Sequence, residues 1–310
     1  MKILVARHSD WHNVFPQEYL CDQVFHGLHS LGHEVTDDGR AWYLYRSEFE
    51  PWGGKYKLDE GHYHGSPLYG GGFSYAATLD EDMSVVRDRE VIKQRIKDHY
   101  YDKIVIGRPD YVPSYMDLIY QHYDRKDILA LDGRDEYSIA HDIANRTTYF
   151  KRELDGEPSE FMRTINFAIA SSKLRDQRAE KTKVLGTVIP FRPETYVFKV
   201  ESEYYDDYAH SLFAITRKKS GWDCMRHYEI LANRCIPYFV DIEMCPKNIM
   251  LTMNKQLLLH IKREVDANSP EYYMPGALGW NEYCAWEDQL NREFKAQCTT
   301  KALATHLLAA

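Results

Sequence analysis

The chain has 310 residues, enough for two domains of ordinary size, and its 44% hydrophobic and 28% charged residues are typical of globular proteins. Its formal net charge is −8 and its Lys and Arg residues are scattered, which excludes a continuous basic surface for nucleic acid. No apolar run approaches the roughly 20 residues of a membrane span, and the six cysteines have neither the spacing of zinc ligands nor that of a disulfide framework.

The first half of the chain alternates between short apolar runs and helical segments. The opening run is continuous, as expected for a parallel strand buried on both faces. The predicted strands lie near residues 1–7, 33–35, 103–107, 128–132 and 149–154, and the predicted helices near 18–31, 88–99 and 114–123. This alternation predicts a doubly wound α/β domain with a parallel sheet.

Residues 38–80 interrupt the alternation. They are rich in Tyr and Gly and show neither the helix period nor the strand period. We predict a long irregular insertion, and loops of this length inside a domain are usually functional. The 24 Tyr of the chain would suit stacking on sugar rings, although an aromatic-rich core explains them equally well.

A break at residues 155–158 precedes a second round of alternation. The predicted strands are 184–190, 212–216 and 235–240; helices are predicted up to about 205 and over 224–233, and the tail from 280 to 310 is mostly helical. We therefore predict two Rossmann-like domains, residues 1–158 and residues 159–310, the second ending in the terminal helix.

The most informative stretch is residues 213–239. Asp223 is a suitable N-cap for the helix that follows, and Glu229 lies one turn beyond Arg226 on the same face. Four cations crowd this helix N-terminus: Arg217, Lys218, Lys219 and Arg226. Since a helix N-terminus itself favours an anion, the cluster predicts a bound diphosphate, with Glu229 in reach of ribose hydroxyls. The alternative is that the lysines are solvated loop charges and Glu229 pairs with Arg226.

This stretch, GWDCMRHYEILANRCIPYF, resembles the donor-binding segment of exostosin-like and group-1-like GT-B glycosyltransferases. The likeness is strongest over residues 205–245 and weaker in the opening strand–helix unit and in YFKREL. The resemblance implies donor binding by the C-terminal domain, transfer in the inter-domain cleft and no obligatory metal.

Two positions depart from the pattern of this family. Retaining group-1 enzymes commonly carry a second Glu eight positions before the helix Glu, where this chain has Gly221. Its absence favours an inverting reaction. Arg234 stands where Gly is usual before the Cys-Ile-Pro strand, so the turn is expected to differ.

An inverting transfer needs a general base near the acceptor hydroxyl. We expect it on loops that follow the strands of the N-terminal domain, because ligands bind there in open α/β sheets. The loops offer three sets of side chains: His8, Asp10 and His12; Asp110; and Asp132, Asp135 and Glu136. We favour Asp10, with Asp135 as its rival, although capping, turn formation and pairing of Asp135 with Arg134 are structural alternatives.

The sequence thus predicts a cytoplasmic hexosyl- or pentosyltransferase that moves a sugar from a UDP- or GDP-type donor to a glycan or another hydroxyl acceptor. No cofactor or metal is expected, since Asp206-Asp207 lies in a Tyr-rich helical context unsuited to a metal site. Two alternatives stay open: another sugar-nucleotide enzyme, such as an epimerase or a phosphorylase-like enzyme, and a non-catalytic glycan-binding protein.

Overall fold

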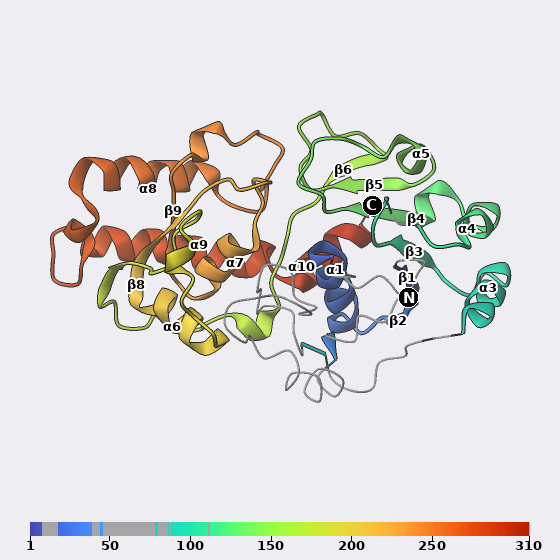
Figure 1. Cartoon of the computed structure of the whole chain (residues 1–310), viewed down its shortest axis with the longest axis horizontal. Helices are drawn as coiled ribbons and strands as arrows, with labels where there is room; N and C mark the ends of the chain where they lie inside the picture. Colours follow the sequence, from blue (N-terminus) through green and yellow to red (C-terminus); the bar gives the residue numbers. More distant parts are fainter. Residues whose placement is uncertain are drawn as a thin grey trace. The chain divides into compact units, whose positions relative to one another are not determined.

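Six parallel strands form the sheet of the first of two structural units. The structure is a computed structural model that describes residues 1–7, 18–38, 44–45, 78–79, 86, 88–110 and 112–309. Unit 1 comprises Met1–Ile165 and Thr300–Ala310, and unit 2 comprises Asn166–Thr299 (Figure 1). Each unit is described by itself.

The sheet of unit 1 has the strand order β2-β1-β3-β4-β5-β6, and all neighbouring strands are parallel. Its strands are β1 (Lys2–Ala6), β2 (Glu34–Asp37), β3 (Lys103–Ile106), β4 (Ile128–Asp132), β5 (Thr148–Lys151) and β6 (Met162–Thr164). The carboxyl ends of the strands therefore meet at one edge, where ligands bind in open α/β sheets. This confirms the predicted α/β class and parallel sheet.

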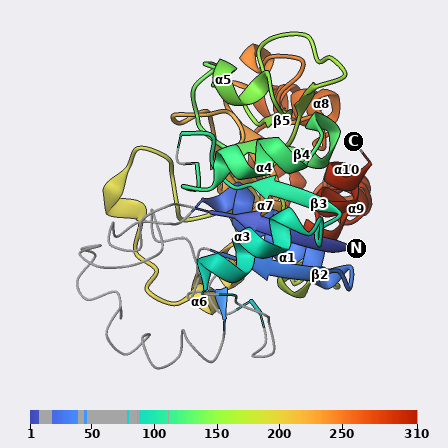
Figure 2. The same ribbon diagram turned by 90° about the vertical axis from the view of Figure 1, so that its right-hand side faces the viewer.

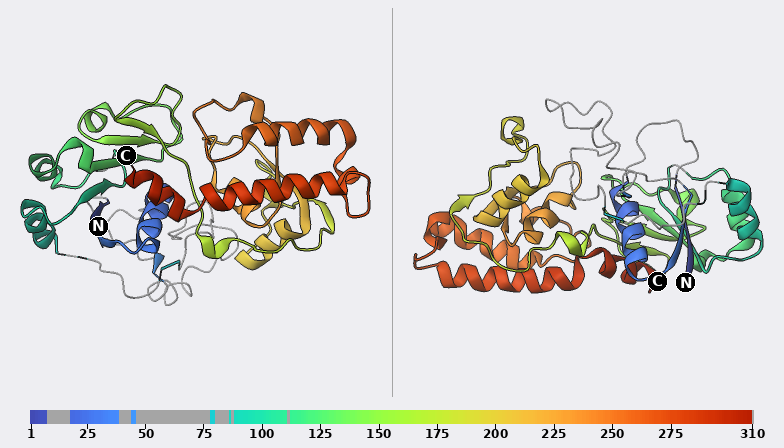
Figure 3. Two further views of the ribbon diagram at one scale, coloured as in Figure 1. Left: turned by 180° about the vertical axis from the view of Figure 1, so that it is seen from behind. Right: turned by 90° about the horizontal axis from the view of Figure 1, so that it is seen from below.

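Helices cover both faces of this sheet. Alternate strand residues such as Leu4, Ile104 and Ala130 pack against α3 (Arg89–Lys97), α4 (Met116–His122) and α5 (His141–Ala144). Figure 2 shows α3 and α4 on the near side of the strands. The opposite face is covered by α1 (Tyr19–Ser30) and α10 (Thr300–Leu308), as the right-hand view of Figure 3 shows.

The last helix of the chain packs closely on the first. A Cβ atom at Gly27 would lie 2.0 Å from the backbone oxygen of Thr300, so only glycine permits this approach. His26 Nδ1 lies 2.9 Å from Thr300 Oγ1, which ties the two helices together beside that contact. The terminal helix thus belongs to unit 1.

Unit 2 contains a smaller parallel sheet of order β7-β8-β9. Its strands are β7 (Lys183–Leu185), β8 (Ser211–Thr216) and β9 (Ile236–Phe239), and its helices are α6 (Glu201–His210), α7 (Met225–Ala232), α8 (Lys255–Asn268) and α9 (Trp280–Gln297). Phe213 in the central strand packs edge-on against Tyr273 and Tyr283, and the Tyr283 hydroxyl donates to the carbonyl of Leu212 at 3.1 Å. These contacts fix α9 to the sheet.

Three predictions of organisation need correction. The division falls at Ile165–Asn166 rather than at residue 158, because β6 pairs with β5 and completes the first sheet. Residues 300–310 leave the second unit, because α10 packs on α1. The strand predicted over 184–190 is β7 alone, which ends at Leu185, and most of the predicted insertion 38–80 lies outside the described residues.

Candidate functional site

The loop that joins β8 to α7 lies at the carboxyl edge of the smaller sheet. β8 is a continuous apolar run that ends at Thr216, and β9 returns parallel to it after α7, so residues 217–224 occupy the edge that binds ligands in α/β folds. Thr216 Oγ1 lies 3.0 Å from His227 Nδ1, which links the end of the strand to the first turns of the helix.

The N-cap of α7 is Cys224 rather than the predicted Asp223. Cys224 has extended backbone angles and no side-chain capping bond. Asp223 is buried, and its carboxylate accepts hydrogen bonds from the Phe167 amide at 2.7 Å and from the Tyr228 hydroxyl at 2.9 Å. Because that carboxylate anchors an inner part of unit 2, it is not available to satisfy the first amides of the helix.

Arg226 lies in the first turn of α7, as predicted, and its side chain is buried, with 8% of the residue exposed. Nη2 donates to the Tyr196 hydroxyl at 2.9 Å. Nε and Nη1 are buried and have no hydrogen-bond partner among the residues that the structure describes. Leaving a buried charged donor unsatisfied is costly, so two donors of this guanidinium remain open to an acceptor from outside the described residues.

Glu229 lies one turn further along α7 and is also buried. Its Oε2 accepts a hydrogen bond from the Tyr204 hydroxyl at 2.9 Å, and the Tyr204 and Tyr208 hydroxyls lie 3.0 Å apart. Burial, and then the charge of Glu229, raise the pKa of Tyr204 well above its usual value, so this hydroxyl remains a donor. Within the described residues Arg226 forms no ion pair with Glu229, which is the structural alternative considered from the sequence.

The other three predicted cations lie on the loop before α7 at the protein surface. Arg217 Nε lies 3.8 Å from Asp241 Oδ2, and Lys218 Nζ donates to the Ser220 carbonyl at 3.3 Å. The Lys219 ammonium adds positive potential at Cys224 and therefore at the start of the helix. The charge of Lys219 thus acts at the start of α7, whereas Arg217 lies beside an acidic neighbour, Asp241, that the sequence interpretation did not include.

Aromatic rings from the loop after β7 complete this surface, and the sequence interpretation missed them. The Tyr196 ring centroid lies 5.5 Å from the Arg226 guanidinium, and the Phe191 ring lies 5.6 Å from that of Arg217. Phe191 is 61% exposed and has a φ of 65°, rare for a bulky residue. Because β7 and β8 are parallel neighbours, their following loops meet at one edge, a signal that could have pointed to these rings.

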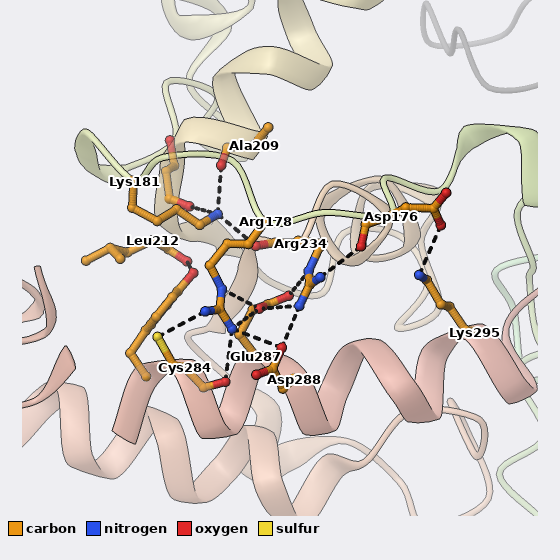
Figure 4. Close-up of polar contacts among 12 residues, drawn as sticks. Asp176, Arg178, Lys181, Ala209, Leu212, Arg234, Cys284, Glu287, Asp288 and Lys295 are labelled. Atoms are coloured by element: carbon orange, nitrogen blue, oxygen red, sulfur yellow. Dashed lines mark hydrogen bonds and ion pairs between the residues drawn. The ribbon is translucent and has the colours of Figure 1, made fainter. Parts of the chain in front are cut away.

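The turn after α7 shows what the unusual Arg234 does. Its φ is 55°, which explains why glycine is usual at this position. The guanidinium holds both Glu287 oxygens at 2.6 and 2.9 Å and Asp288 at 2.6 Å (Figure 4). The buried Lys181 ammonium donates to three backbone carbonyls, including that of Arg234 at 2.7 Å, and burial lowers its pKa to about 8. Each guanidinium nitrogen of Arg234 and the Lys181 ammonium thus has acceptors within the protein.

The aspartate pair of α6 is engaged in structural contacts. Asp206 accepts a hydrogen bond from Arg175 at 2.5 Å. Asp207 pairs with Lys183 and accepts hydrogen bonds from the Thr187 amide at 2.8 Å and hydroxyl at 2.7 Å. Across the described part of the chain, no three His, Cys, Asp or Glu side chains form a group suited to a metal ion.

The carboxylates predicted as bases follow the strands of unit 1. Asp10, like His8 and His12, lies outside the described residues. Asp135 is half exposed and pairs with Arg152, not with Arg134 as the alternative assumed. Asp110 accepts two hydrogen bonds from Arg108, at 2.9 and 2.7 Å; burial alone would raise its pKa, but these bonds and the charge of Arg108 lower it.

Asp132 is buried at the end of β4. It binds Arg134 at 2.8 Å, Lys151 at 3.1 Å and the hydroxyl of Tyr149, and it also accepts a hydrogen bond from the Arg134 amide at 3.1 Å. Burial would raise its pKa, yet these partners lower it. The turn-forming alternative for Asp132 is therefore the one that the geometry favours.

Comparisons with known proteins do not assign the chain to a family. No family model matches the chain, and no curated protein matches it. Among solved structures, MurG from Acinetobacter baumannii is similar over 99% of this chain and 93% of its own, with 9% sequence identity and a TM-score of 0.35. None of the described helices is both long and apolar enough to cross a membrane.

Proposed function

We propose that the protein is a glycosyltransferase whose unit 2 binds the diphosphate of a UDP- or GDP-type sugar at the N-terminus of α7. The observation that carries the proposal is the Arg226 guanidinium, buried at a helix N-terminus with two donors free of protein partners among the described residues. Phosphate oxygens suit both the guanidinium and the helix N-terminus. They accept charge-assisted hydrogen bonds from the guanidinium, and they carry the negative charge that the helix N-terminus favours. Lys219, and Arg217 and Lys218 on the same loop, add positive charge.

The surroundings of Arg226 fit the remaining parts of such a donor. The exposed Phe191 and Tyr196 rings are suited to stack on a nucleobase or a sugar. Glu229, held by Tyr204, is suited to accept hydrogen bonds from ribose hydroxyls. Because the proposed anion site consists of cations and amides, we propose that donor binding needs no divalent metal.

The reaction that we propose is transfer of the sugar to a hydroxyl acceptor with inversion. As the bond from the anomeric carbon to the diphosphate breaks, negative charge develops on the leaving oxygen, and Arg226 would stabilise it. Gly221 at the position of the second Glu of retaining enzymes is the reason to favour inversion. Asp10 and Asp135 remain the bases that the sequence proposes for the acceptor side.

The test measures the binding of UDP and GDP by thermal shift and calorimetry, with and without EDTA, to the wild-type protein and to Arg226→Met. We expect binding to survive chelation and the variant to lose about 1.5–3 kcal/mol, or roughly 10- to 150-fold in affinity. Without nucleotide the variant should be no less stable than the wild type, because the substitution removes unsatisfied donors.

The matched control is Arg175→Ala, since Arg175 is a partly exposed arginine of the same unit that pairs with Asp206. It should bind nucleotide normally. Binding that disappears with EDTA, or that is equal in Arg226→Met and wild type, would move the diphosphate away from α7. Consumption of the sugar nucleotide to an isomer without any acceptor would favour the epimerase instead.

A further inference from the structure

The carboxyl edge of the larger sheet holds many charged side chains, most of them bound to one another. Arg7 pairs with Asp22 at 2.6 Å and with Asp37 at 3.1 Å. Arg152 pairs with Glu153 at 2.8 Å. Asp110, Asp132 and Asp135 are held by arginines, as described above. The oxygens of a carboxylate in such a pair are engaged by the cation that holds it.

Glu18 differs from these acids. It directly precedes α1, and among the residues that the structure describes its side chain has no hydrogen bond and no ion pair. Its Oε1 lies over Gly133 in the loop after β4, where a Cβ would be only 2.0 Å away. Glu18 as a residue is partly exposed, whereas its carboxyl group is desolvated by burial. The absence of a side chain at Gly133 therefore makes room for this carboxylate.

The charges that face Glu18 come from four parts of unit 1. Arg108 follows β3 and Arg152 follows β5, and both lower its pKa; Asp22 in α1 and Asp132 in β4 raise it. Burial is the largest effect, and the net result raises the pKa of Glu18 to about 7. Near neutral pH such a group both accepts and donates protons, which is the property of an efficient general base.

We propose that Glu18 is the catalytic base of unit 1, which takes the proton from the attacking hydroxyl. This assignment rests on the proposed transferase function. In the step, the O–H bond of the acceptor breaks and its proton passes to a Glu18 oxygen. The acceptor oxygen bonds to the anomeric carbon, and the bond from that carbon to the diphosphate breaks, with its electron pair leaving on the diphosphate. Glu18 replaces Asp135, whose carboxylate is engaged by Arg152.

The experiment measures the release of UDP or GDP from a sugar nucleotide, with water as the acceptor. The sugar nucleotides are UDP-glucose, UDP-galactose, UDP-xylose, GDP-mannose and GDP-fucose. The proteins compared are the wild type, Glu18→Gln, Asp10→Asn and Asp135→Asn. Glu18→Gln should lose on the order of 10²–10⁴ in kcat while its affinity for UDP or GDP stays unchanged. In the wild type, kcat/KM should rise with pH through about 7, because the ionised form of Glu18 is the active one. Glu18→Gln should lack this rise.

A second variant keeps the carboxylate and moves it. Gly133→Ala places a Cβ against Oε1, so it should lower kcat and shift the pH midpoint, which a purely structural role would not do. The matched control is Glu90→Gln on the exposed surface of α3, which should leave both unchanged. Wild-type turnover in Glu18→Gln, or an unaltered pH profile, would overturn the assignment of Glu18 alone. Failure of the wild type to bind either nucleotide would overturn the proposed function with it.

Discussion

Arg226 and Arg234 lie eight residues apart in unit 2, and 8% of each is exposed, yet their guanidinium groups are in opposite states. That of Arg234 is bound by two carboxylates and the Asp176 carbonyl. That of Arg226 has one protein partner, Tyr196, in the described structure. The cost of burial is offset for Arg234 and not for Arg226, and this difference in donor saturation is the reason why we propose Arg226 as the ligand-binding residue.

Arg234 should stabilise unit 2 in spite of its backbone conformation. Arg234→Gly would relieve roughly 1 kcal/mol of strain. It would also remove a bidentate partner from the buried Glu287, and leaving a buried charge without any partner costs about 3–5 kcal/mol. Because Arg178 still holds Glu287 at 2.6 Å after the change, we expect a smaller net loss, about 1–3 kcal/mol in the free energy of unfolding, measured with urea.

The double variant Arg234→Gly, Glu287→Gln provides the control, because it also removes the charge that has lost one of its two arginine partners. It should be less destabilised than the sum of the two single variants. An Arg234→Gly protein as stable as the wild type would mean that the ion pair contributes no more than the strain.

At the level of single residues, the sequence predicts what depends on local spacing. The positions of Arg226 and Glu229 on one face of α7 follow from the helix period, and both are found there. Glu18 and Tyr196 could not be found in this way. Their significance comes from Gly133 and Arg226, which are distant in sequence and become neighbours only through the order of parallel strands.

Among the elements, the contact between α1 and α10 is the most demanding sterically. At Gly27 a side chain would meet backbone, which cannot rotate away. Gly27→Ala should therefore destabilise unit 1 by about 1–3 kcal/mol, the usual cost of overpacking. Thermal unfolding with and without nucleotide would measure this, and nucleotide affinity should stay normal because α7 belongs to the other unit.

Gly156→Ala is the comparison for this change. An added Cβ there meets Leu154 at an ordinary 3.9 Å, so its stability should change by less than about 0.5 kcal/mol. If Gly27→Ala and Gly156→Ala unfolded at the same temperature, the close packing of α10 on α1 would not be needed for stability.

The elements that the sequence predicted best are those with a continuous apolar pattern. β1, β3 and β4 are nearly or fully buried, and their apolar runs mark them. β6 and β7 have three residues each and are only partly buried, so burial leaves no pattern in them. β6 forms because it pairs with β5, not because its own residues prefer a strand.

At the scale of the whole molecule, the two units differ in how the chain builds them. Unit 2 is one continuous stretch, Asn166–Thr299, whereas unit 1 needs the first and last parts of the chain. A fragment of residues 166–299 should therefore fold and bind UDP or GDP alone. A fragment of residues 1–165 would leave one face of α1 uncovered, so it should be less stable than unit 1 or unfolded. Adding a peptide of residues 300–310 should restore the stability of this fragment.

Circular dichroism and calorimetry on the fragments would check this prediction, with the full chain as the reference. A fragment 1–165 that unfolds cooperatively at the temperature of unit 1 in the full chain would contradict it. The sequence predicted a two-part organisation, but it could not assign residues 300–310, because their apolar face fits any partner helix equally well.

The return of α10 to α1 also decides the order in which a newly made chain can fold. Residues 1–165 leave the ribosome before unit 2, but one face of α1 stays uncovered until residues 300–310 have been added. Domains usually mature from the N-terminus during synthesis, and here unit 2 can finish while unit 1 still waits. A nonsense codon or a frameshift shortly before the codon of Thr300 would thus damage the part of unit 1 that was translated first.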